Sequence, residues 1–315
     1  MSRASLRDQT LQCGDFSIDV LGEYTTVSNK RWLDREYEAP AEEPLAKATS
    51  DARLTPNDWK CLVRFVAAQD VRTPARLVET SQRWNQTLPG ILDHTLRDVV
   101  RKLGESRDRG EIAQQEPTGG TESIPLRVTK EIEPGHDVGK LKAEVVVGRS
   151  VWLFSMRHLL KNTVSVLQQQ KWTILSAPQG IHWITSDDPV IKLNYYRPGV
   201  YDFKGGWGNR GTEILLPLSP RHRLYTQVGQ RRSRRGEIPR AEAEMIRRFI
   251  AEHAHRLIFA AEPDPEVPRL RPRTVNADLW RDEIDLWRKW HEEQTTAERE
   301  VMGWGQEQPV PKDGE

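Results

Sequence analysis

Apolar residues recur at helical spacing through much of the first half of the chain. The segment TPND at residues 55–58 has the composition of a helix start, and apolar residues follow it at three- and four-residue steps as far as residue 69. Thr73-Pro74 then predicts a break or restart, because proline removes a backbone donor and restricts the residue before it. The same spacing predicts helices over residues 76–84, over residues 89–103 with an end at Gly104, and over residues 138–170.

The second half of the chain has the composition of β-strands. Two strand-like segments, WTILSA at residues 172–177 and IHWITS at residues 181–186, flank a Pro-Gln-Gly loop and predict a hairpin. Shorter strands are expected at residues 190–193, 212–216, 224–228 and 257–260. We therefore predict an α+β fold, in which a helical layer packs on an antiparallel sheet and a helical appendage follows at the C-terminus.

These elements imply one main domain with additions at both ends. Residues 1–35 are polar and poorly defined, apart from a strand-like alternation at residues 16–20. We predict a single α+β domain over residues 36–260, with a helical part at 53–170, a mobile insertion at 104–123 and a β-rich part at 172–260. A proline-rich linker at 261–275, a helix at 276–301 and a disordered tail at 302–315 complete the expected organisation.

Charge and hydropathy narrow the function classes. The 47 basic and 46 acidic residues almost cancel, so the overall field does not steer the protein toward nucleic acid or an anionic membrane. The sequence has no apolar run of membrane-spanning length and no signal-peptide core, and we expect a cytoplasmic protein. A local arginine-rich loop contains Arg231, Arg232, Arg234 and Arg235. These side chains could contact a nucleic-acid backbone, but we favour a solvated loop because acidic residues lie close by.

Two motifs carry a family resemblance. They are FVAAQDVRTPAR at residues 65–76, and WTILSAPQGIHWITSDDPV at residues 172–190 followed by LLPLSP at residues 215–220. Together they resemble the domain of unknown function 4238 family of bacteria and fungi, whose members carry Gln-x-x-Arg-x-Pro and Thr-Ser-Asp-Asn-Pro-Val signatures. Asp188 stands where the family usually has Asn, and Glu38 matches an upstream family glutamate. The family's N-terminal His-x-x-Pro motif is not found here, and the resemblance implies no activity.

The candidate site residues come from the motifs. Asp187 and Asp188 end a predicted strand, where two carboxylates could work with Glu38 as catalytic acids or hold a divalent metal. Gln69, Arg72 and Ser186 are the candidate ligand-binding residues, since Gln69 and Arg72 share one helical face. A structural interpretation competes with each. Ser-Asp-Asp-Pro is good turn chemistry, and an Arg72 contact with Glu38 or Asp187 would join the helices to the sheet.

The sequence is compatible with two alternative functions from different classes of protein. The first is a domain that binds a small polar or anionic ligand at the Asp187 turn, with metal-dependent hydrolase or phosphodiesterase activity and a defence or toxin role as its extension. The second is a non-catalytic interaction protein that uses its tryptophan-rich C-terminal helix. Trp280, Ile284 and Trp287 fall on one face of that helix, which would contact its own domain, a protein partner or a second copy of the chain. The pair His253 and His255 diverges on a helix, so we expect no metal site there.

Overall fold

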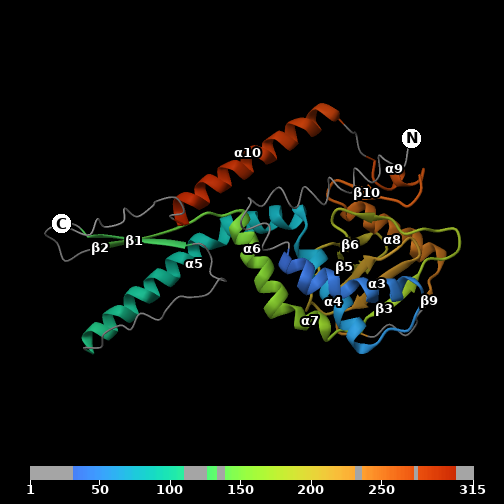
Figure 1. The fold of residues 1–315 in the computed structure, drawn as a ribbon, viewed down its shortest axis with the longest axis horizontal. Helices are drawn as coiled ribbons and strands as arrows, with labels where there is room; N and C mark the ends of the chain where they lie inside the picture. Colours follow the sequence, from blue (N-terminus) through green and yellow to red (C-terminus); the bar gives the residue numbers. More distant parts are fainter. Residues whose placement is uncertain (1–30, 110–125, 133–138, 231–235, 273–275, 303–315) are drawn as a thin grey trace, which may run out of the picture. The chain divides into compact units, whose positions relative to one another are not determined.

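The computed structural model describes residues 31–109, 126–132, 139–230, 236–272 and 276–302 (Figure 1). The chain divides into two compact units, one of Met1–Arg76 with His158–Glu283 and the other of Leu77–Arg157 with Ile284–Glu315. Within the described part, none of the helices has the length and apolarity to cross a membrane. The predicted strand at residues 16–20, the arginines at 231–235 and most of the predicted insertion lie outside the described residues.

The first unit begins with short helical turns that lead into a longer helix. A π-helical turn, η1 (Asp34–Glu38), is followed by the 3-10 turn η2 (Ala39–Ala41), by α3 (Glu42–Thr49) and by α4 (Pro56–Val71). The predicted start of α4 is confirmed. The Thr55 hydroxyl accepts the Asp58 N–H at 3.2 Å and the Asp58 carboxylate accepts the Thr55 N–H at 2.8 Å, with proline in the first turn. The helix then ends before Pro74, as the sequence predicts.

A six-stranded sheet forms the centre of this unit. Its strand order is β6-β5-β7-β8-β3-β9, and all pairs are antiparallel except β3 with β9. The strands are β3 (Thr173–Ser176), β5 (Ile191–Arg197), β6 (Val200–Asp202), β7 (Glu213–Pro217), β8 (His222–Gln227) and β9 (Gly236–Glu237). The predicted α+β class, with an antiparallel sheet and a C-terminal helix, is confirmed.

The predicted hairpin at residues 172–186 is wrong. β3 pairs with β8, whereas only Thr185–Ser186 forms a strand, β4, and it pairs with β10 (Ile258–Phe259) in a separate two-stranded sheet. The segment before β4 instead bonds to the loop ahead of β8. The Trp183 backbone N–H donates to the Pro220 carbonyl at 2.8 Å, and the Trp183 indole N–H donates to the Arg221 carbonyl at 3.2 Å. The predicted return strand at residues 257–260 is confirmed as β10.

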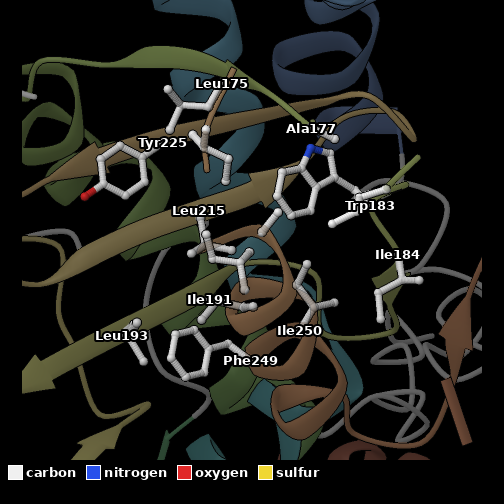
Figure 2. Close-up of a cluster of buried hydrophobic side chains, with 14 of the residues drawn as sticks. Leu175, Ala177, Trp183, Ile184, Ile191, Leu193, Leu215, Tyr225, Phe249 and Ile250 are labelled. Carbon is white, nitrogen blue, oxygen red and sulfur yellow. The ribbon is translucent and has the colours of Figure 1, made fainter. Parts of the chain in front are cut away.

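Helix α8 (Arg240–His253) covers one face of the sheet and makes the main core. Phe249 and Ile250 of α8 lie against Ile191 and Leu215 of the sheet, as Figure 2 shows. Along β5 the side chains alternate, so Lys192 points to the opposite face, where its ammonium reaches Asp70 at the end of α4. Helices therefore cover both faces of the sheet, with α8 on one face and the end of α4 on the other.

The same unit also contains η3 (Leu159–Thr163), α7 (Val164–Gln168) and α9 (Val267–Leu270).

The second unit consists of a long helix, a hairpin and parts of two further helices. α5 (Pro74–Asp108) is one continuous helix, with Pro89 in its interior and Gly104 before its end, so the separate helices predicted at residues 76–84 and 89–103 are joined. β1 (Leu126–Ile132) and β2 (Gly139–Val145) form an antiparallel hairpin, followed by α6 (Arg149–His158). The predicted helix over residues 138–170 is therefore wrong before residue 146.

The C-terminal helix α10 (Ala277–Met302) caps the N-terminus of α6 with its side chains. Glu298 pairs with the buried Arg149 and accepts a hydrogen bond from the Ser150 hydroxyl, while Gln294 accepts the Arg149 backbone N–H at 3.3 Å. A carboxylate at this position satisfies a helix terminus and complements its dipole. Earlier in α10, the rings of Trp287, Trp290 and His291 contact one another.

Candidate functional site

Asp70, in the last turn of α4, is the centre of a buried polar cluster. Its residue is 2% exposed, and its carboxylate accepts three hydrogen bonds. Lys192 Nζ and Trp207 Nε1 each donate to Oδ2 at 2.8 Å, and Arg76 Nε donates to Oδ1 at 3.2 Å. Burial alone would raise the pKa of Asp70, but the charges of Lys192 and Arg76 and the hydrogen bonds hold it below its usual range. The carboxylate is therefore ionised and fully compensated.

Asp188, in the turn after β4, lies next to this set. Its Oδ1 accepts a hydrogen bond from the Thr73 hydroxyl at 3.2 Å, and its Oδ2 lies 3.9 Å from Arg76 Nη2 and 3.6 Å from His253 Nε2. The His253 ring also bonds through Nδ1 to the Asp188 carbonyl at 3.0 Å. Arg76 thus lies between two buried acids, and the α4–α5 junction is joined to the β4–β5 turn.

The Asp188 and His253 side chains are shifted toward their neutral forms. Burial raises the pKa of Asp188, and the Asp70 carboxylate adds to this effect, while His253 and Arg76 oppose it. Burial likewise lowers the pKa of His253. One buried carboxylate is therefore charged and the other is held closer to the protonated state, because Lys192 and Trp207 bond Asp70 and not Asp188.

Asp187 and Ser186 make turn contacts. The Asp187 carboxylate accepts the backbone N–H of His255 at 3.0 Å and that of Arg256 at 2.8 Å, so it caps the chain that leaves α8. The Ser186 hydroxyl donates to the Asp188 carbonyl at 2.9 Å. Asp187 therefore points at backbone donors, and these contacts favour the structural interpretation of the Ser-Asp-Asp-Pro motif.

Glu38, Gln69 and Arg72 meet at the edge of the buried cluster. One end of the Arg72 guanidinium pairs with Glu38, and the other donates to Gln69 Oε1 at 2.9 Å. The Arg72 and Glu38 side chains are 36% and 33% exposed, in contrast to the buried acids. The surrounding protein lowers the pKa of Arg72 by desolvation, so the guanidinium gains from an anionic partner.

The π-helical turn η1 positions Glu38. Tyr37, within this turn, is buried. Its hydroxyl donates to the Leu160 carbonyl of the second π-turn, η3, at 3.2 Å. The centroid of its ring lies 4.6 Å from the guanidinium carbon of Arg64. Single π-turns are rare and are frequent at functional sites. Here the turn fixes the glutamate whose carboxylate faces Arg72.

The structure thus divides the predicted site residues into two groups. Glu38, Gln69 and Arg72 come together, whereas Ser186 and Asp187 are held in turn contacts and Asp188 is buried in the cluster. Within the described residues, no group of three or more His, Cys, Asp and Glu side chains is arranged to hold a metal ion.

Most residues of the buried cluster are not among those predicted from the sequence: Asp70, Thr73, Arg76, Lys192 and Trp207. Asp70 and Arg76 lie inside the first motif, and Lys192 follows the second motif by two residues. A lysine between apolar residues of a buried strand is the signal that could have identified a charged partner. His253 was considered only as a metal ligand.

Residues 33–264 match the family model described as "Protein of unknown function (DUF4238)". The match covers well over half of the chain, and the chain belongs to this family. It spans every residue of the buried cluster and of the Glu38–Arg72 pair. No curated protein and no solved structure matches the chain.

Proposed function

We propose that the DUF4238 domain of this chain binds a small anionic ligand through Arg72. The observation that carries the proposal is the contrast in exposure within the motif. The charges on Asp70, Arg76 and Lys192 are buried and compensate one another, while the Arg72–Glu38 pair is about one-third exposed on both members.

The buried cluster supports the proposal by fixing the backbone on which Arg72 stands. Arg72 directly follows α4, whose last turn holds Asp70, and precedes α5, whose first turn supplies Arg76. A guanidinium held on such a support needs little ordering when a ligand arrives. Its planar donors suit a carboxylate or a phosphate equally.

Glu38 acts in this proposal as an internal stand-in for the ligand. Its carboxylate occupies one side of the Arg72 guanidinium, which is the position that a ligand carboxylate or phosphate would take. The ligand must therefore displace Glu38 or bind beside it. Because Glu38 is a competing anion, its removal should strengthen ligand binding.

The test is calorimetric titration with inorganic phosphate and with citrate at constant ionic strength. Arg72→Gln is expected to weaken binding by about tenfold to a hundredfold, the loss of one charge-assisted contact. Arg240→Gln is the matched control, since Arg240 is an exposed arginine of the same unit paired only with Glu244 in the described structure. Equal affinity of the Arg72→Gln variant and the wild type for both anions would overturn the proposal.

A further inference from the structure

A serine, a histidine and an aspartate form a chain of hydrogen bonds beside the turn between β7 and β8. His222, the first residue of β8, is 4% exposed. Its Nδ1 lies 3.0 Å from the Ser219 hydroxyl oxygen, and its Nε2 lies 3.1 Å from Asp51 Oδ1. Asp51 is remote in the sequence, in the loop between α3 and α4, but belongs to the same unit. The fold therefore brings a hydroxyl, an imidazole and a carboxylate together.

The Asp51 carboxylate fixes the tautomer of His222. A carboxylate only accepts hydrogen bonds, so Nε2 carries the ring proton and donates it to Asp51. In the neutral ring, Nδ1 then has a lone pair, which accepts the hydrogen bond of the Ser219 hydroxyl. The imidazole is thus positioned to take the Ser219 proton. A hydroxyl, a base and a group that orients the base, all within hydrogen-bond reach, are the arrangement that activates a catalytic serine.

The backbone of the turn favours negative charge on the Ser219 oxygen. The backbone N–H groups of Arg221 and His222 both donate to Ser219 Oγ, at 3.2 Å and 3.0 Å. Such donors bind an alkoxide more strongly than a neutral hydroxyl, so they ease the loss of the proton. Ser219 is half-buried, and its neighbours Pro220 and Arg221 are exposed. The serine therefore lies at the surface of the unit, with the buried imidazole behind it.

The backbone of Asp51 is held in an unusual conformation. Asp51 has a φ of 58°, and glycines are the only other residues with positive φ in the described part of the chain. It follows the end of α3, where helices commonly have glycine, and the Ala52 N–H closes the turn on the Lys47 carbonyl at 2.9 Å. Glycine would adopt this conformation at lower cost but has no carboxylate for His222. Residues held in such conformations are concentrated at functional sites.

We propose that Ser219, His222 and Asp51 form a triad that hydrolyses small carboxylic esters. The Ser219 oxygen attacks the carbonyl carbon of the ester while its proton passes to His222 Nδ1. The ring then gives this proton to the leaving alcohol oxygen as the ester bond breaks, and an acyl-serine remains. Water next attacks the acyl carbon and gives one proton to Nδ1, and Ser219 regains that proton as the carboxylic acid leaves. Asp51 is a positioning residue, since it acts only through the ring.

The triad shares no residue with the Arg72 site, so each can fail without the other. A purely structural interpretation also exists, because serine hydroxyls commonly bond the backbone of a turn. That interpretation accounts for the contacts of Ser219 but predicts no reaction at its oxygen.

Covalent labelling with a fluorophosphonate separates the two interpretations, since this reagent transfers its phosphonyl group to an activated serine with loss of fluoride. Peptide mass analysis of the labelled full chain is expected to give an adduct on Ser219. Ser219→Ala should lose this adduct. Ser165→Ala, which changes an exposed serine of α7, is the control and should keep it.

Asp51→Asn is the second variant, and it should fold because the Asp51 side chain is 72% exposed. Asparagine can hold His222 in the wrong tautomer, so the labelling rate should fall about tenfold or more. The kcat for hydrolysis of p-nitrophenyl acetate should fall by a similar factor while KM stays unchanged, because Asp51 does not touch the substrate.

Two results would overturn the proposal. The first is a folded wild type that forms no adduct on Ser219. The second is an Asp51→Asn variant that is labelled at the wild-type rate, which would show that Asp51 does not activate Ser219. If Ser219→Ala does not fold, the labelling rate of Asp51→Asn decides.

Discussion

Two buried aspartates that lie close to the same arginine have pKa values shifted in opposite directions. Asp70 accepts hydrogen bonds from Lys192, Trp207 and Arg76, and its pKa is held low, while Asp188 has a raised pKa. The number and charge of the donors explain the difference. The two residues should therefore respond in opposite ways to the same substitution.

Asp70→Asn should destabilise the protein strongly. The change leaves Lys192 and Arg76 buried without their shared counter-charge, and the loss of one partner from a buried pair costs roughly 3–5 kcal/mol. Urea unfolding followed by tryptophan fluorescence measures this loss. A cost below that of an ordinary surface substitution would show that the network contributes nothing to stability.

Asp188→Asn should be neutral or stabilising near pH 7. A folded-state pKa above 3.8 means that the folded state binds the proton more tightly than the unfolded state, so the stability that the carboxyl contributes declines as pH rises through the folded pKa. Asparagine keeps the shape of the side chain but does not ionise, so the stability of the variant does not decline in this way as pH rises. The variant should gain stability relative to the wild type between about pH 4 and pH 7. Unfolding curves at both pH values give the stability of the variant relative to the wild type. A variant that is less stable than the wild type at the higher pH would contradict the prediction.

The environment of Asp188 agrees with that expectation. Burial raises the pKa of its carboxyl and so disfavours the negative charge. The sequence alone could not show this, because the burial of Asp188 depends on Thr73 and His253, which are distant in the chain.

At the scale of elements, the sequence predicts where helices begin and end better than it predicts which strands pair. The start of α4 at Thr55 and the break at Pro74 follow from local chemistry, and both are confirmed. Strand β2 was mistaken for a helix because Leu141 and Val145 are four residues apart, a spacing that places residues on one face of a helix and also of a strand. The alternation in GKLKAEV is the signal that separates the two.

The internal proline of α5 shows a second limit of local rules. Proline removes one backbone hydrogen bond and strains the preceding turn, but it does not have to end a helix. Local chemistry therefore predicted a boundary near Pro89, whereas the helix continues from Pro74 to Asp108. The hairpin pairing predicted for residues 181–186 was wrong for a different reason. The partner of β4 is β10, which lies far along the chain.

The cap of α10 on α6 should depend on Glu298. Glu298→Gln removes the counter-charge of Arg149, which is 3% exposed, and we expect a loss of roughly 3–5 kcal/mol in the local stability of this contact. Hydrogen exchange of the C-terminal half of α10 should then quicken. Glu292→Gln, on the exposed side of the same helix, is the control. Equal exchange in the two variants would contradict a role for the Arg149–Glu298 pair.

At the scale of the whole molecule, the family motifs and the contact of α10 with α6 lie in different units. The unit of Met1–Arg76 and His158–Glu283 holds the family motifs, the buried cluster and the Arg72 site. The unit of Leu77–Arg157 and Ile284–Glu315 holds most of α5, the β1–β2 hairpin and the Arg149–Glu298 pair. The sequence predicted the residues of the first unit's motifs but not which of them are buried, since burial is a property of the assembled sheet and helices.

The affinity of Glu38→Gln for inorganic phosphate tests the central claim most directly. If Glu38 competes with the ligand for Arg72, the variant binds phosphate more tightly than the wild type, by about threefold to tenfold, and adding Arg72→Gln abolishes the gain. A purely structural Glu38–Arg72 pair predicts no such gain, only a less stable fold. Unchanged or weaker phosphate binding in a folded Glu38→Gln variant would contradict the account.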